Sequence, residues 1–445
     1  MRITHIHINN FKGFEEKSFE FKERFTVAIG NNGLGKSTLL NALQVGLGAF
    51  LQSMPTLPAN YIYRRQFKTG ERFVKYYPER KDYLPNKENP SLIVAAMWYP
   101  NDSADELPVP LRWERHYLPS NGTTHKKVHS ADIIRYANFL FDNHATKKNV
   151  LYPVLANFYI NRSDAQVRRV DKKWRRMSRL EKGYYTALGD SVDFTGVYEW
   201  LHSYEKKVKD EVEFEGTIQA MYDAITTAIP YIKEIEYNSK YDEFEVLVDF
   251  NDGQPVERKI ASMLSDGMKA MLNMVAEIAY RCVMLNGKLG YDAVVKSPGV
   301  VLIDELDMHL HPTWQRHVIK DLKASFPSMQ FVVTTHSPFI VQSLTKEELI
   351  IMEDNIDSDS DPFRRSIEEI ASTEMGVEEV QRSKLFMEME QVAARYYDLI
   401  GQGKTSANNE EVAALRIRLN ELEDYFSEDP AFVALLKSER KASNL

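Results

Sequence analysis

One octapeptide near the N-terminus has the residue types and the spacing that bind a chain of phosphates. The run Gly30-Asn31-Asn32-Gly33-Leu34-Gly35-Lys36-Ser37 fits the pattern G-x-x-x-x-G-K-[ST] at every fixed position. The glycines let backbone N–H groups turn inward around phosphate oxygens. A lysine at this position reaches the β- and γ-phosphates, and the following hydroxyl is a magnesium ligand. The residues expected to bind the nucleotide are Gly30, Asn31, Asn32, Gly33, Gly35, Lys36, Ser37 and Thr38.

The sequence around this phosphate loop predicts the elements that would position it. Residues 25–29 are typical of a short buried strand, and residues 38–43 of a helix. A helix that begins at this point adds a partial positive charge beside the phosphates. The alternative is a glycine-rich turn that matches the pattern by chance, and the strand-turn-helix context argues against it.

Two later strands are predicted to end in residues that could act on the same phosphates. Residues 300–303 are apolar and lead into Asp304 and Glu305. We expect Asp304 to hold Mg2+, directly or through water, and Glu305 to act as the general base for the attacking water. Residues 330–335 form another apolar run, which ends at His336.

A third motif, Leu264-Ser265-Asp266-Gly267, precedes a helix that is predicted to extend through Met284. Ser265 is expected to be the N-cap of that helix. Its hydroxyl, the Gly267 amide and the helix dipole form a set of groups that can bind an anion.

Taken in order, these motifs resemble the ABC-type ATPases of the SMC, RecF and OLD group, and so does the opening run Ile8-Asn9-Asn10-Phe11-Lys12-Gly13-Phe14. The resemblance implies an α/β fold, with an ABC/SMC-type P-loop ATPase head, a mixed sheet, an antiparallel β-subdomain, a helical lobe and a helical C-terminal tail. It implies ATP and Mg2+ as cofactors, with Ser37 and Asp304 as metal ligands. It also implies composite sites: Lys36, Glu305 and His336 are the catalytic residues of one chain, whereas Ser265, Gly267 and Asp307 act across a dimer interface.

The resemblance and the composition together predict four regions. They are residues 1–160 as the N-terminal part of the head (with an insertion at about 51–90), 161–232 as a basic helical lobe, 233–352 as the C-terminal part of the head, and 353–445 as an acidic helical tail. In this family the strand near residue 158 leads to a glutamine loop, for which Gln166 is the nearest candidate. The pair His309 and His311 is interpreted as a structural turn before a helix rather than as a metal site.

Two stretches are rich in basic residues. Residues 61–81 interleave them with aromatic residues, and residues 162–182 contain nine basic and three acidic side chains. Both patterns favour contact with the phosphates of DNA or another nucleic acid. The alternatives are a solvated insertion, a solvated helix face, or contacts with an acidic neighbouring subunit.

Charge and composition limit the class of protein. The net charge is −8, and residues 353–445 hold 21 acidic and 11 basic side chains, so the acidic excess lies in the C-terminal part. No apolar run approaches the about 18 residues that a membrane span needs. The chain opens directly into strand-like sequence, and its single cysteine, Cys282, rules out a disulfide framework. We therefore expect a cytoplasmic protein of two or three lobes without membrane contact.

The tail bears on the function. Glu353, Asp354, Asp357, Asp359 and Asp361 mimic parts of a nuclease TOPRIM site, but they are crowded into one loop and are interpreted as a solvated turn. The closing helices, at 415–423 and from Asp429 on, resemble the ATPase subunits of Septu-type and retron-linked antiphage systems. That resemblance implies a homo-oligomeric ATPase that regulates a separate HNH nuclease. A RecF-type DNA-repair clamp is the alternative, and a switch that binds ATP but barely hydrolyses it is a third hypothesis.

Overall fold

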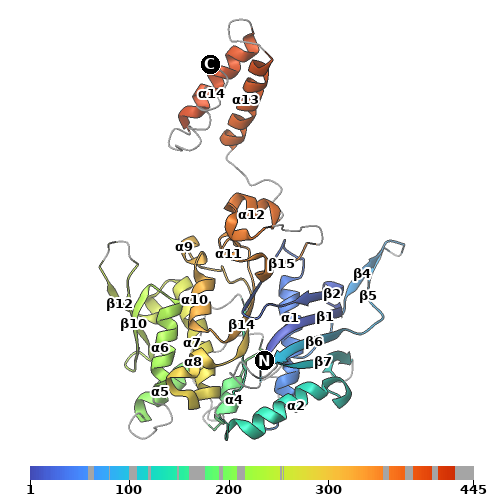
Figure 1. The fold of residues 1–445 in the computed structure, drawn as a ribbon, viewed down its shortest axis with the longest axis vertical. Helices are drawn as coiled ribbons and strands as arrows, with labels where there is room; N and C mark the ends of the chain where they lie inside the picture. Colours follow the sequence, from blue (N-terminus) through green and yellow to red (C-terminus); the bar gives the residue numbers. More distant parts are fainter. Residues whose placement is uncertain are drawn as a thin grey trace. The chain divides into compact units, whose positions relative to one another are not determined.

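The computed structural model describes residues 1–58, 65–79, 81–99, 108–118, 122–147, 150–159, 176–189, 194–207, 216–250, 253, 255–353, 360–375, 384–402 and 409–425. The chain divides into two compact units, Met1–Gly376 and Val377–Leu445 (Figure 1). The first unit contains the phosphate loop and the Ser265, Asp304 and His336 motifs. It has the α/β architecture of a P-loop ATPase head, as predicted.

A five-stranded parallel sheet forms the centre of the first unit. Its strand order is β15-β3-β14-β13-β9. Four of these strands, all except β15, are buried at every position, as continuous apolar runs between two helical layers must be. The strands are β3 (Phe25–Ile29), β9 (Val154–Phe158), β13 (Gly299–Ile303), β14 (Met329–Thr334) and β15 (Leu349–Ile351).

Antiparallel strands form separate sheets. The largest has the order β2-β1-β6-β7-β8, and all its neighbouring strands pair antiparallel. A hairpin of β4 (Val74–Tyr77) and β5 (Asp82–Pro85) projects beside this sheet (Figure 1). The strands of the larger sheet are β1 (Arg2–Phe11), β2 (Phe14–Glu20), β6 (Ser91–Trp98), β7 (Val109–Leu118) and β8 (Gly122–Thr123). The predicted mixture of parallel and antiparallel strands is therefore present, distributed over different sheets.

A third sheet leads into the Ser265 motif. It contains the antiparallel strands β10 (Ile232–Asn238), β11 (Glu243–Val248) and β12 (Glu257–Ile260). The helices of the first unit are α1 (Lys36–Ser53), α2 (Lys127–His144), α4 (Arg179–Tyr184), α5 (Thr195–Lys207), α6 (Thr217–Ala228), α7 (Asp266–Asn286), α8 (Ala293–Lys296), α9 (Pro312–Gln315), α10 (Val318–Ser325), α11 (Pro338–Val341) and α12 (Ile367–Thr373). Cys282 is fully buried within α7, and this burial raises the pKa of its thiol.

One buried polar side chain joins the parallel sheet to the antiparallel sheet. The amide of Gln330 on β14 accepts a hydrogen bond from the Ile3 N–H (2.7 Å) and donates one to the Ile3 carbonyl (2.7 Å). It also donates to the Lys22 carbonyl (2.7 Å). Because Gln330 is fully buried, these bonds fix the relative position of the two sheets.

The second unit is a helical hairpin of α13 (Lys384–Gly401) and α14 (Glu410–Tyr425). It has its own small core, made of Met389, Ala393, Tyr396, Leu399, Val412, Leu419 and Leu422. Ion pairs of Arg395 with Glu411 (3.0 Å) and of Arg418 with Glu388 (2.8 Å) run along it and set the helices antiparallel. Over the described residues, no helix combines the length and the apolar character required to cross a bilayer.

Candidate active site

The candidate active site lies along one edge of the parallel sheet, where its strands end. Parallel strands bring their carboxyl ends to the same edge, and this is where open α/β sheets bind ligands. The strand order places Glu353 (after β15), the phosphate loop (after β3), His336 (after β14) and Asp304 (after β13) side by side. The phosphate loop thus meets three groups that follow it by about 300 residues in the sequence.

The phosphate loop has the backbone that its glycines permit. Gly30, Gly33 and Gly35 have φ angles of 145°, 89° and 100°, a region that L-residues with side chains avoid. The ring of Phe14 lies beneath Gly35, at 2.5 Å from where a Cβ would be, so the loop also needs a glycine there for space. α1 begins at Lys36, and the loop residues from Asn31 to Gly33 are exposed. The loop is therefore open to a phosphate chain.

Lys36 is held inside this loop. Its Nζ donates to the carbonyls of Gly30 (2.5 Å) and Asn31 (3.2 Å). Burial lowers the pKa of the ammonium group, and four carboxylates, with Glu353 the strongest, oppose this shift. A bound triphosphate would supply further negative charge beside a cation that burial has left poorly solvated.

The prediction that the acidic residues after β15 form a solvated turn is wrong for Glu353. The sequence suggested a solvated acidic turn, yet the Glu353 Oε1 accepts a hydrogen bond from the Asn31 N–H of the phosphate loop (2.8 Å), and its Oε2 is buried. The reason is topological: β15 pairs with β3, so the residues that follow the two strands are neighbours. Asp354, Asp357 and Asp359 lie outside the described residues, while Asp361 accepts a hydrogen bond from the Lys346 N–H (3.0 Å).

The two carboxylates after β13 are organised by a threonine from the next strand. The Thr334 Oγ1 donates to the Asp304 Oδ1 (2.6 Å) and accepts from the Glu305 N–H (2.8 Å). Asp304 is 4% exposed, and Glu305 has a φ of 49°, which turns the chain sharply after the strand. Sequence reasoning missed Thr334, although its place in the run Thr334-Thr335-His336 was a signal.

Asp307 is tied to the same strand end as His336. Its Oδ1 accepts from the Thr335 hydroxyl (2.5 Å) and from the His336 N–H (3.1 Å). Asp307 therefore fixes the backbone of the histidine within one chain; its predicted action across a dimer interface stays a prediction. His311 is the N-cap of α9, so the run after Asp307 is the structural turn that was expected.

The Ser265 motif is built as predicted. Ser265 is the N-cap of α7, and its Oγ accepts from the Met268 N–H (3.4 Å). A side chain at Gly267 would collide with the backbone carbonyl of His309, so the glycine allows the start of α7 to pack against the turn after Asp307. Ser265 and Asp266 are exposed. The N-terminal end of α7, where an anion is predicted to bind, is therefore accessible.

The donor set fits ATP with Mg2+. Hydroxyl and carboxylate oxygens are the ligands that Mg2+ prefers, and Ser37 and Asp304 supply them from adjoining loops. The open loop amides and Lys36 supply the phosphate contacts.

Gln166, the candidate for the glutamine loop, lies outside the described residues, as do residues 162–175. Of the basic stretch, Arg179 donates to the Val283 carbonyl of α7 (2.7 Å), so at least this cation contributes to packing.

The comparisons with known proteins agree with this site. Residues 127–342 match the family described as "AAA domain, putative AbiEii toxin, Type IV TA system", and residues 1–63 match the family "AAA domain". The chain is 24% identical to the Retron Ec83 probable ATPase of Escherichia coli, over 79% of this chain and 71% of that protein. It is 24% identical to the Retron Vc95 probable ATPase of Vibrio cholerae serotype O1 biovar El Tor, over 91% of this chain and 84% of that protein. Against the Septu protein PtuA of Bacillus thuringiensis, identity is 32% over 34% of this chain and 39% of that protein.

Proposed function

Because the chain is a P-loop ATPase related to retron ATPases and to Septu PtuA proteins, we propose that it is the ATP-hydrolysing subunit of an antiphage defence complex. In this proposal two copies dimerise through composite ATP sites and regulate a separate HNH nuclease. ATP state and dimer geometry are coupled, since a bound nucleotide favours the closed pair.

One observation carries the proposal. The strand ends of one chain assemble Lys36, Asp304 and His336, whereas the exposed Ser265 stands at the start of another element, α7. One chain therefore supplies the phosphate-binding, metal-binding and base groups, and it also presents an outward-facing Ser265 motif. In this proposal the Ser265 motif of a second copy completes the nucleotide site of the first.

Each side chain has a defined task in hydrolysis. Lys36 and the loop amides bind the β- and γ-phosphates, and Ser37 and Asp304 hold Mg2+, which when bound neutralises charge on the phosphates. Glu305 takes a proton from the attacking water, while His336 holds that water and the γ-phosphate in line. The partner subunit's Ser265 motif donates hydrogen bonds to the γ-phosphate, which ties closure to the presence of ATP.

Replacing the base tests both hydrolysis and dimerisation. We expect Glu305→Gln to lower the rate of phosphate release by about 100-fold or more, because a positioned general base contributes roughly 10²–10⁴-fold. The variant should still bind ATP and elute as a dimer in its presence, measured by size-exclusion chromatography with light scattering. Hydrolysis at the wild-type rate would refute the assignment of the base, and an ATP-bound monomer would refute the composite site.

We further propose that the chain binds DNA or another nucleic acid through the β4–β5 hairpin. Tyr76 and Tyr83 are 46% and 67% exposed, with ring centroids 4.9 Å apart. Exposed aromatic rings can stack on unpaired bases, each worth about 1–3 kcal/mol. The double variant Tyr76→Ala/Tyr83→Ala should weaken single-strand binding in fluorescence anisotropy by at least tenfold. Unchanged affinity would exclude the hairpin from the nucleic-acid interface.

The partner is tested in the native host. Affinity purification of the full chain and of a chain that ends at residue 376, before the helical hairpin unit, compares the co-purifying proteins. An HNH protein that is recovered with the full chain and lost with the shorter one supports the proposal. Recovery of the ATPase alone, with ATP-dependent DNA binding, favours the alternative of a RecF-type repair clamp.

A further inference from the structure

Three potential metal ligands converge on the β-subdomain, away from the nucleotide site. Glu114 and His116 lie two residues apart on β7, so both point to the same face of the strand. His129 lies in the first turn of α2. Within the described part of the chain, this is the one group of three His, Cys, Asp or Glu residues whose ligand atoms all lie within 4.8 Å of one another.

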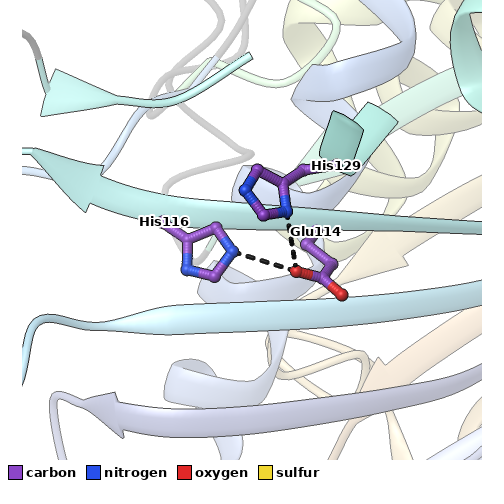
Figure 2. A group of neighbouring side chains, drawn as sticks. All are labelled: Glu114, His116 and His129. Carbon is purple, nitrogen blue, oxygen red and sulfur yellow. Dashed lines mark hydrogen bonds and ion pairs between the residues drawn. The ribbon is translucent and has the colours of Figure 1, made fainter. Parts of the chain in front are cut away.

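The three side chains point at a common centre (Figure 2). The Nε2 of His116 lies 3.1 Å from the Glu114 Oε2, and the Nδ1 of His129 lies 3.0 Å from the same oxygen. The two imidazole rings are tilted by 57°, with their centroids 4.8 Å apart. Both rings therefore turn a nitrogen toward one carboxylate oxygen, although they come from different elements.

We propose that Glu114, His116 and His129 bind a divalent transition-metal ion, with Zn2+ as the preferred species. Two imidazole nitrogens and one carboxylate oxygen form a donor set typical of zinc, whereas Mg2+ and Ca2+ prefer oxygen alone. Zinc bonds of about 2.0–2.2 Å in a tetrahedron separate neighbouring ligand atoms by roughly 3.4 Å. The oxygen–nitrogen separations of 3.0 and 3.1 Å need to widen by only a few tenths of an ångström.

The surroundings of the cluster suit an ion that keeps one open position. The side chains of Glu114, His116 and His129 are 20%, 35% and 33% exposed, so water can reach the site as a fourth ligand. Arg112 Nη2 lies 3.1 Å from the other oxygen of Glu114 and holds the carboxylate in place, leaving Oε2 to face the histidines.

A bound ion would fasten α2 to the sheet. The N-cap of α2 is Lys126, which makes no side-chain hydrogen bond to the helix, and Ser130 departs from helical geometry (φ −134°, ψ 19°). The start of this helix thus lacks the usual side-chain cap. The contact of His129 with Glu114 anchors it to β7, and a metal would replace this hydrogen bond with a coordinate cross-link.

The test compares metal binding by tag-free, nucleotide-free protein that has been stripped with a chelator. Calorimetric titration with ZnCl2 should show one site in the wild type. Glu114→Gln, His116→Gln and His129→Gln should each weaken binding at least tenfold; glutamine keeps a hydrogen-bonding side chain at each position. His7→Gln is the matched control, because His7 lies in the same sheet and faces a single carboxylate, Glu16 (3.7 Å).

A second readout does not depend on the variants folding. X-ray absorption of the zinc-loaded wild type should show a nitrogen and oxygen shell with scattering from two imidazoles, and Zn2+ should raise the thermal unfolding midpoint of the wild type and of His7→Gln. The alternative, two histidines satisfied by hydrogen bonds to a carboxylate, predicts no saturable zinc binding. That result, or affinities within twofold across all five proteins, would overturn the proposal.

Discussion

The carboxylate of Glu353 would compete with the phosphates of ATP for the same groups of the phosphate loop. Its Oε1 takes a hydrogen bond from the Asn31 amide (2.8 Å), and its charge is the strongest of the four carboxylates acting on Lys36. Phosphates that enter the loop bring negative charge to the same groups. We therefore predict that Glu353→Gln binds ATP more tightly than the wild type, because glutamine retains an acceptor oxygen for Asn31 but removes the charge.

The size of the effect follows from two estimates. A hydrogen bond to a charged group contributes about 1.5–3 kcal/mol, which the wild type gives up when ATP displaces Glu353. Two unit charges 5 Å apart repel by roughly 3 kcal/mol at an effective dielectric constant of 20. Because Glu353 is partly exposed, solvent weakens both interactions, and we take the lower end of these energies, about 1.5 kcal/mol. This free-energy difference corresponds to a roughly tenfold change in the affinity for ATP.

Titration of a fluorescent ATP analogue, at constant salt and Mg2+, measures this change. Glu347→Gln is the matched control. Glu347 lies in the exposed turn just before β15, and its substitution removes the same charge from the protein. The affinity of Glu347→Gln should equal that of the wild type. If Glu353→Gln binds ATP with unchanged or lower affinity, the carboxylate does not compete with phosphate, and its bond to Asn31 only holds the loop.

Three further predictions concern single side chains. Thr334→Val should lower ATP turnover about tenfold with little change in ATP affinity, since the threonine hydroxyl holds the Asp304 carboxylate and the Glu305 backbone N–H, and a lost buried hydrogen bond costs about 1–3 kcal/mol; an unchanged kcat would refute this. Gly267→Ala should abolish ATP-driven dimerisation in light scattering, because its methyl group meets a backbone carbonyl, whereas Gly13→Ala, with open space around it, should dimerise normally. Burial lowers the pKa of His144 to about 4, so the unfolded chain binds more protons between pH 6.5 and 4 and stability falls as the pH drops through this window. His144→Gln should remove about 1–2 kcal/mol of that fall in denaturant titrations, since solvent screens the half-buried ring; an identical pH dependence would refute it.

Local pattern was enough to predict the elements that carry each motif. The phosphate loop, the Asp304-Glu305 strand end and the Ser265 cap depend on consecutive residues, so the sequence alone identified these motifs and the strands and helices beside them.

Contacts between segments far apart in the chain could not be predicted from local sequence patterns. Glu353 reaches the phosphate loop because β15 pairs with β3, and no spacing in the sequence encodes that pairing. The Glu114 cluster was missed for a similar reason: two of its ligands share a strand, but His129 comes from a helix that had not been predicted. The requirement for glycine at position 267 likewise becomes visible only when the turn after Asp307 is placed against α7.

The strand order of the parallel sheet has a consequence for how the protein is made. Both neighbours of β3 come late in the chain: β14 begins at Met329 and β15 at Leu349. During synthesis, the strand that carries the phosphate loop must wait for about three quarters of the polypeptide before it has a partner, and such non-local pairing is slow. A product that ends before Met329 would leave β3 without either of its neighbours, so we expect it to bind no ATP.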